Sequence, residues 1–524
     1  MATPHPGIKL IIPVNSLNKP LTADFKKLTV TLIKTLGSAA VLNFGMAASN
    51  AADAIYAFTT TTPGELAFIL IHGSITKALI ELVGESVGER LAEARLEGDS
   101  VDEQLLSALS GKEVFIDKDF LDRPDELPVI EDIQCIVKQW LNDCGIKEND
   151  VESIVKRLPS YFGYALIQEW RKDTTRYDTI IKALDTPFSK AVERQWAWLE
   201  YGALLQRRVD ECVFDETFSL SQIYVPLNAY YEDTVKDVSR PGQKIQRRVV
   251  IRLDEEIDGW LQNVDKEDAI RVISGGPGSG KSSFARMLAA RLAKEGKKVL
   301  YVPLHKIDPA KDFVKEIGEF ARDEGVLVQN PLEPDSPEPD LVIILDGLDE
   351  LASQGKAAEK TARDFVREVE KTVERRTPRL RVLINGRELV VQENKLEFRG
   401  KRQILNLLPY YQHNKYAYHD PTGFLQNDLR DDWWKKYGSL KGNGYEAMPK
   451  ELKREELDDI TVQPLLNYLL VLSYTRGKLK FDQDTNLNSI YSDLVDAVYE
   501  RGYEKHPYKP IRHMTGNNFI STWT

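Results

Sequence analysis

Apolar residues recur at intervals of three and four positions through most of the first 215 residues. The spacing is plain around residues 28–36 and 133–140, whereas the strict alternation of a half-buried strand is scarce. Such spacing places apolar side chains along one face of a helix. We therefore predict an N-terminal all-α domain over residues 1–215, with breaks at the polar, proline-containing turns 59–64 and 122–124.

The pattern changes after residue 265, where short apolar runs of strand length alternate with helical segments as far as residue 410. Parallel strands need crossover connections, so this alternation predicts a parallel sheet with helices on both faces. The predicted strands are 269–274, 298–302, 341–345 and 381–384, and the first predicted helix is 281–294.

Two further segments flank the predicted sheet. Residues 216–265 contain a short extended run at 223–227 and an acidic stretch at 231–242 with Pro and Gly, which together predict a linker leading into the sheet. Residues 411–524 return to helical spacing and predict a C-terminal helical domain. A chain of 524 residues is long enough for this number of domains.

Charge and cysteine content narrow the class of protein. A net charge of −11 supplies no global basic field, so nucleic acid is not an expected partner. Cys135, Cys144 and Cys212 are too few for a disulfide framework and lack the spacing of a metal pair. Residues 1–19 lack the basic flank and continuous apolar core of a secretory signal, so we expect a cytoplasmic location.

Two apolar stretches, residues 28–44 and 66–84, are long enough to raise the question of a membrane. The first contains Lys34, and the second contains Lys77 and Glu81. Both fall short of the roughly 20 clean apolar residues of a membrane-spanning helix. Helical spacing in the first stretch favours the core of a helical bundle.

A phosphate-binding motif lies between the first predicted strand and the first predicted helix. Glycines in such a turn let successive backbone N–H groups point into one concavity, and the following helix adds its positive N-terminal end. Lys281 is expected to reach the β- and γ-phosphates, and Ser282 to hold Mg²⁺ through its hydroxyl. We predict a site for ATP or ADP with Mg²⁺, made by Gly275, Gly276, Pro277, Gly278, Ser279, Gly280, Lys281, Ser282 and Ser283.

Acidic residues follow the predicted strand 341–345, at the sheet edge where the phosphates would lie. Asp346 is the expected second ligand of Mg²⁺ or of its waters. Either Asp349 or Glu350 could orient or deprotonate the attacking water; the spacing does not separate them, although we favour Glu350. Arg387 ends the next strand, where it could face the γ-phosphate or be an ordinary surface arginine.

Together with the motif at residues 462–466, these signatures resemble the NACHT family of STAND NTPases over roughly residues 220–510. The resemblance implies an α/β fold: a parallel-sheet P-loop NTPase core at residues 266–410, preceded by an all-α domain and followed by a helical domain. It also implies that Pro464 packs near adenine and that the segment 223–227 lies beside the base. From the residues alone, Pro464 is a proline that begins a helix.

Members of this family are switches, and the resemblance implies the same here. ADP holds a closed monomer, and a ligand sensed by a C-terminal repeat region permits ATP exchange and homo-oligomerisation, which gathers the N-terminal effector domains. We expect a bacterial intracellular immune receptor against phage; the alternative is a STAND-type signalling ATPase that controls transcription. The acids lie in an Asp-Gly-x-Asp-Glu signature at residues 346–350, which argues against a metabolic kinase.

The chain departs from that pattern at its C-terminal side. Sixty residues follow Pro464, too few for a winged-helix domain and a repeat array, so the helical domain is a candidate truncated start of a winged-helix region. We expect the trigger to be a phage component or a separate sensor protein. Residues 1–215 lack a catalytic or metal motif, which leaves a helical adaptor or a membrane-perturbing effector that uses the stretches 28–44 and 66–84.

Overall fold

The structure is a computed structural model that describes most, but not all, of the chain. The apolar stretch 28–44 and the chain beyond residue 499 lie outside the described residues. The described residues are 8–10, 62–93, 115–117, 119–184, 193–213, 216–236, 244–263, 265, 268–333, 338–352, 356–375, 380–394, 398, 400, 402–477, 481 and 487–499.

Where the structure describes it, the N-terminal region is helical, as predicted, apart from one small antiparallel pair of strands, β1 (Ile8–Lys9) and β2 (Phe115–Ile116). Aromatic and aliphatic side chains of its helices form one hydrophobic core. Its helices among the described residues are α3 (Pro63–Glu93), α5 (Val129–Asp143), α6 (Glu148–Lys172), α7 (Thr174–Leu184) and α8 (Glu193–Asp210), with the short 3-10 helix η3 (Pro124–Glu126).

Helix α3 is buried on all sides over much of its length, and every residue from 66 to 80 is buried. The segment Pro63–Gly88 is long and apolar enough to cross a membrane, yet its apolar window lies wholly inside the protein. A helix that is apolar all round is expected at the centre of a bundle. The second apolar stretch of the sequence is therefore the central helix of the N-terminal core.

The second region is built on a seven-stranded, mostly parallel sheet with the order β4-β3-β9-β5-β8-β7-β6. Strands β5, β6, β7, β8 and β9 run parallel, whereas β3 is antiparallel to both of its neighbours. The α/β fold is thus confirmed. The strands are β3 (Asn228–Lys236), β4 (Lys244–Arg252), β5 (Ile270–Ser274), β6 (Lys298–Pro303), β7 (Leu341–Asp346), β8 (Arg381–Gly386) and β9 (Ile404–Leu407).

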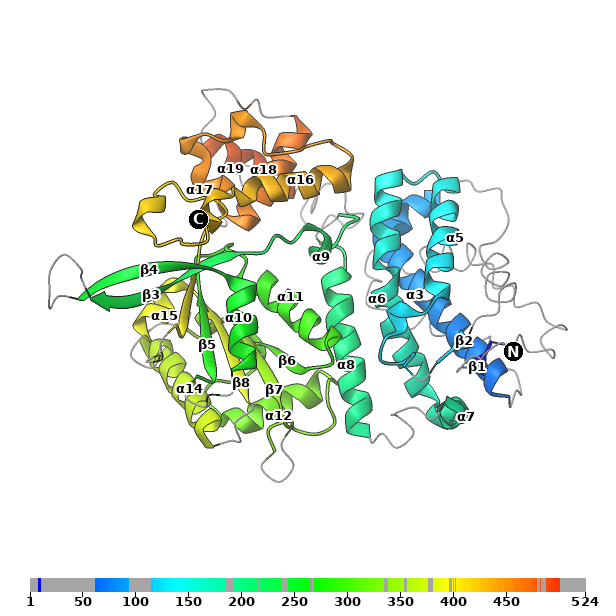
Figure 1. Cartoon of the computed structure of the whole chain (residues 1–524). Coiled ribbons are helices and arrows are strands. Elements are labelled where there is room, and N and C mark those ends of the chain that lie inside the picture. The colour runs from blue at the N-terminus through cyan, green and yellow to red at the C-terminus, as the bar shows by residue number, and fades with distance from the viewer. Residues whose placement is uncertain are drawn as a thin grey trace, which may run out of the picture.

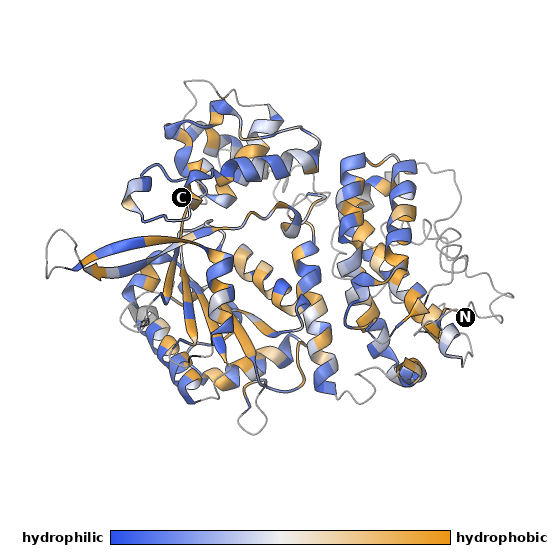
Figure 2. Cartoon of the chain, in the orientation of Figure 1, coloured by the Kyte–Doolittle hydropathy of each residue, from blue (hydrophilic) through white to orange (hydrophobic). Residues whose placement is uncertain are grey.

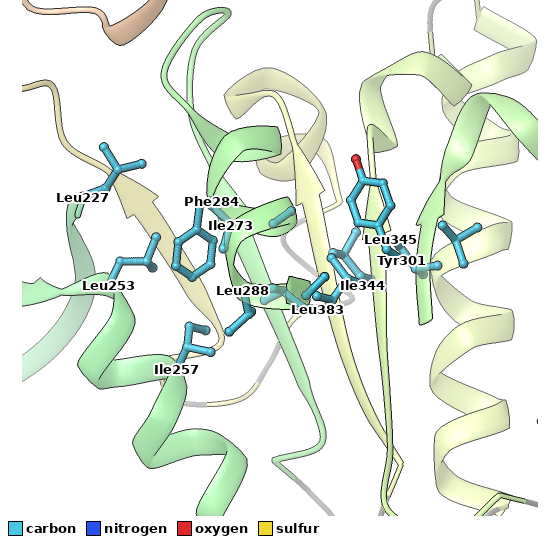
Figure 3. Close-up of a cluster of buried hydrophobic side chains, with 14 of the residues drawn as sticks. Leu227, Leu253, Ile257, Ile273, Phe284, Leu288, Tyr301, Ile344, Leu345 and Leu383 are labelled. Carbon is cyan, nitrogen blue, oxygen red and sulfur yellow. The ribbon is translucent and has the colours of Figure 1, made fainter. Parts of the chain in front are cut away.

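Helices cover both faces of this sheet, which explains why its central strands are continuous apolar runs. Figure 3 shows side chains of two of these helices, α10 and α11, meeting each other beside the sheet. Right-handed crossovers place α11 on one face and the helices after β6 and β7 on the other. The helices are α10 (Leu253–Gln262), α11 (Lys281–Lys294), α12 (Phe313–Asp323), α13 (Leu348–Ala352), α14 (Lys356–Arg375) and α15 (Glu388–Glu393).

The predicted linker at residues 231–242 is wrong where the structure describes it, because residues up to 236 belong to β3. This strand pairs along its whole length with β4, and the two form a long hairpin (Figure 1). Its acidic residues are accommodated because Glu232 and Asp233 lie opposite Arg248 and Arg247 on β4. The acidic composition that suggested a linker is one half of a cross-strand charge pattern.

Helix α8 joins the N-terminal region to the sheet. Trp196 belongs to the N-terminal core, whereas Trp198, Tyr201 and Leu205 belong to the core around the sheet. Figure 1 shows α8 between α6 and α11. The domain boundary at residue 215 stays a prediction, but this helix takes part in both cores.

The C-terminal region is helical, as predicted, and lies against the carboxyl edge of the sheet (Figure 1). Figure 2 shows hydrophobic residues concentrated in the strands and on the inner sides of the helices. The described elements are α16 (Leu429–Lys441), α17 (Asp458–Thr461), α18 (Pro464–Arg476), α19 (Leu487–Tyr499) and the 3-10 helices η6 (Lys415–Ala417), η7 (Phe424–Gln426), η8 (Lys450–Leu452) and η9 (Glu455–Leu457).

Candidate nucleotide site

The glycine-rich motif connects β5 to α11 at the centre of the sheet, as the sequence predicted. Gly278 has φ of 72° and Gly280 has φ of 93°, in the left-handed region that side chains with a Cβ rarely adopt. Gly280 is also the N-cap of α11. The two glycines let the chain curl back so that α11 begins with its first N–H groups facing the loop.

Lys281 lies across this loop. Its ammonium group donates hydrogen bonds to the carbonyl oxygens of Gly275 at 2.7 Å and Gly276 at 2.9 Å. Burial lowers the pKa of Lys281, and the nearby carboxylate of Asp349 partly offsets that effect. The side chain is held directly above the loop expected to bind the β- and γ-phosphates.

Asp346 is held beside the loop by three side chains. Its Oδ1 accepts hydrogen bonds from Ser282 Oγ at 3.1 Å and from Asn385 Nδ2 at 3.0 Å. Its Oδ2 accepts a hydrogen bond from the hydroxyl of Tyr301 at 2.7 Å. Burial and the neighbouring Asp346 carboxylate raise the pKa of Tyr301, so this phenol stays a donor at neutral pH.

The residues fit a magnesium site. Ser282 and Asp346 bring a hydroxyl and a carboxylate oxygen together, the hard oxygen donors that Mg²⁺ prefers when phosphate oxygens and waters complete its shell. Ser279 Oγ and Asn385 Oδ1 are buried in the same region and have no hydrogen-bond partner within the described part of the chain. Buried polar atoms of this kind are expected where a polar ligand binds.

The two further acids have different partners. Asp349 accepts the backbone N–H of Arg387 at 3.2 Å and forms an ion pair with its guanidinium at 2.7 Å. Glu350 instead contacts Nδ1 of His305, in the 3-10 helix η5 (Leu304–Lys306), at 3.0 Å. Because Arg387 engages both oxygens of Asp349, Glu350 remains the better candidate for orienting water, and that role stays a prediction.

The C-terminal region reaches the same loop through the start of α18. Leu465 donates its backbone N–H to the carbonyl of Gly278 at 3.3 Å. A Cβ placed on Gly280 would lie 3.1 Å from Leu227 and 3.6 Å from Pro464. The fold therefore brings together the loop, the segment 223–227 and Pro464, which the sequence analysis had connected through a family resemblance.

Three residues beside the site were missed by the sequence analysis, namely Tyr301, His305 and Asn385. Asn385 directly follows the apolar run 381–384, so the reasoning that identified Asp346 after its own strand could have found it. Tyr301 and His305 come from β6 and the turn after it. No sequence signal shows that β6 lies beside β7, which is what brings them to the acids.

Two family models match parts of the chain. Residues 16–220 match the model described as NACHT N-terminal Helical domain 3. Residues 258–321 match the model described as Novel STAND NTPase 3, and this range includes β5, the glycine-rich loop, α11 and β6. Comparison with curated proteins gives no match.

Proposed function

We propose that this chain, which is a NACHT/STAND NTPase, binds ATP with Mg²⁺, hydrolyses it slowly and uses the exchange as a switch. The observation that carries the proposal is the contact between Ser282 and Asp346 at 3.1 Å, next to Lys281 on the loop. A hydroxyl, a carboxylate and an ammonium group within one loop–strand junction match the needs of a metal–triphosphate complex.

Each side chain has a distinct role in this proposal. Lys281 would exchange the loop carbonyls for the β- and γ-phosphates, and Ser282 and Asp346 would hold Mg²⁺, which would supply charge neutralisation. Glu350 orients the attacking water or accepts its proton. Arg387 leaves Asp349 and contacts the γ-phosphate, which lets the protein distinguish ATP from ADP.

The contact between the loop and α18 supports a switch. Leu465 and Pro464 touch the loop from a region that begins after β9, so a change of nucleotide reaches the C-terminal helices directly. A nucleotide can shift such an arrangement only by binding its two forms with different affinity. We propose that the arrangement with α18 on the loop is the closed form of the switch, that ADP stabilises it and that ATP favours its opening.

For the biological role, we propose a cytoplasmic bacterial receptor in anti-phage defence, with a signalling ATPase outside defence as the alternative. Activation would assemble copies of the chain and gather their N-terminal helical domains. We propose that this domain acts as an adaptor; a membrane-active role would require the residues 66–80 of α3 to leave a buried position. The trigger would be a phage component or a separate sensor.

The test is the mass of the protein in solution by light scattering with ADP, with ATP and Mg²⁺, and as Glu350→Gln with ATP. A discrete oligomer with ATP or in the variant, and a monomer with ADP, is expected. Lys281→Ala serves as the control with much weaker triphosphate binding, and it should stay monomeric at ATP concentrations that saturate the wild type. If wild type and Glu350→Gln bind ATP yet stay monomeric both with a phage lysate and with a lysate of phage-infected host cells, the oligomerising switch is wrong.

A further inference from the structure

Tyr301 contacts Asp346 through its side chain and Tyr201 of α8 through its backbone, and it has no role in the chemistry proposed above. It lies in β6 and is 6% exposed, so its ring belongs to the core. Figure 3 shows its hydroxyl oxygen pointing away from the labelled apolar side chains. That hydroxyl donates to Asp346 Oδ2 at 2.7 Å, and its oxygen accepts a hydrogen bond from Arg286 Nε at 3.5 Å.

The two oxygens of Asp346 are held from opposite sides. Oδ1 faces Ser282 and Asn385, and Oδ2 faces Tyr301. A metal ion would bind through a lone pair of the Ser282 hydroxyl oxygen, and the hydroxyl proton would stay available to Asp346. Tyr301 and Asn385 hold the carboxylate independently of the residue that would share the metal with it.

The backbone of the same tyrosine is held by α8. The hydroxyl of Tyr201 accepts the N–H of Tyr301 at 3.1 Å and donates to its carbonyl at 3.3 Å. Strand β6 is the last strand on its side of the sheet, so these backbone groups point away from β7. The hydroxyl of Tyr201 therefore pairs with both backbone polar groups of Tyr301 at the edge of the sheet, and the side chain of Tyr301 in turn holds Asp346.

We propose that Tyr301 is a positioning residue for the metal ligand Asp346, and that Tyr201 couples the placement of α8 to it. The inference rests on the proposed nucleotide function. Thermodynamic linkage makes this coupling reciprocal. If a shift of α8 changes the metal affinity by some factor, then bound metal–nucleotide changes the equilibrium between the positions of α8 by the same factor. The route runs from the nucleotide through Asp346 and β6 to the helix that also belongs to the N-terminal core.

In the first experiment, Mn²⁺ is titrated into the ADP complex as a paramagnetic replacement for Mg²⁺, and electron paramagnetic resonance measures the fraction bound. Tyr301→Phe keeps the ring and loses the hydroxyl, and we expect Mn²⁺ affinity to fall about tenfold, the lower end for residues that orient a metal ligand. ADP affinity without metal should be unchanged. The matched control is Tyr161→Phe, which removes a hydroxyl bonded to Glu85 in the N-terminal core.

Tyr201→Phe tests the coupling separately. We expect a smaller loss of Mn²⁺ affinity and faster hydrogen exchange of the Tyr301 amide, because the edge of β6 loses its partner. If wild type fails to bind ADP, the nucleotide function itself is wrong. If wild type binds ADP and Mn²⁺ but both tyrosine variants match it in Mn²⁺ affinity, the function stands and the positioning role is overturned.

Discussion

The contact between the glycine-rich loop and α18 can be weakened without adding charge or removing a phosphate ligand. Gly278→Ala places a Cβ 3.3 Å from Leu465 Cβ, and the φ of 72° at this position adds backbone strain. Gly296→Ala is the matched control, because its φ is 74° and nothing lies within 4 Å of its added Cβ. Both variants bear a left-handed conformation that costs about 1–2 kcal/mol.

The difference between the two variants isolates the contact with α18. Leu465 is 43% exposed, so it can move outward, and that movement breaks its 3.3 Å hydrogen bond to the Gly278 carbonyl. A net hydrogen bond contributes about 1 kcal/mol, so the closed form should lose about fivefold in population relative to its open form.

The assay is hydrogen exchange of the first amides of α18 in the presence of saturating ADP. The Leu465 amide should exchange about fivefold faster in Gly278→Ala than in Gly296→Ala. Equal exchange rates in the two variants would refute the reasoning, because they would mean that the contact does not hold α18 on the loop.

Three further predictions concern single side chains. Lys281→Ala should lower ATP affinity about 100-fold, because hydrogen bonds to charged groups contribute about 1.5–3 kcal/mol each. Lys297→Ala, at an exposed position, is the control and should leave ATP affinity unchanged. Calorimetry with ATP and Mg²⁺ measures both affinities. Arg387→Ala should lower ATP affinity while leaving ADP affinity unchanged in the same titration, and no loss would assign Arg387 to the surface. Burial lowers the pKa of His72 to about 4, so the unfolded chain binds its proton first as the pH falls below about 6.5. The free energy of unfolding should therefore decrease by about 3 kcal/mol between pH 6.5 and 4, and urea titrations of His72→Leu should give a flatter profile.

Much of the fold around the nucleotide site follows from local patterns. Helix 281–294 and strand 298–302 were predicted to within one residue, because each is a short apolar run bounded by turn residues. Strands β3, β4 and β9 of the large sheet were missed, as was the small pair β1 and β2. In β3 the polar residues are compensated by partners on β4, and a cross-strand pair has no signature within one strand.

The site was predictable only where a strand end carries its own chemistry. The sequence spacing alone identifies Asp346 and Lys281 as candidate site residues, and Asn385 could have been found in the same way. The hydroxyl of Tyr301 reaches Asp346 because Pro303 pairs with Asp346 in the register of β6 and β7. That register depends on the order of strands in the sheet, which is set by tertiary packing.

The position of α8 determines which part of the chain can separate when the switch operates. Its contact with the sheet core buries Trp198, Tyr201 and Leu205, and exposing such side chains costs about 1.5–3 kcal/mol each.

Its contact with the rest of the N-terminal domain is more polar: Arg207 pairs with Glu81 at 3.3 Å, and Arg171 of α6 pairs with Glu200. Water can replace the partner of Arg171 when the surfaces part, although the largely buried pair of Arg207 and Glu81 and the stacked rings of Trp170 and Trp196 oppose the separation. We therefore expect α8 to follow β6, to which Tyr201 ties it, and to separate from α3 and α6. ATP should then speed hydrogen exchange in α6 and leave α8 protected, and the reverse pattern would place the moving surface between α8 and α11.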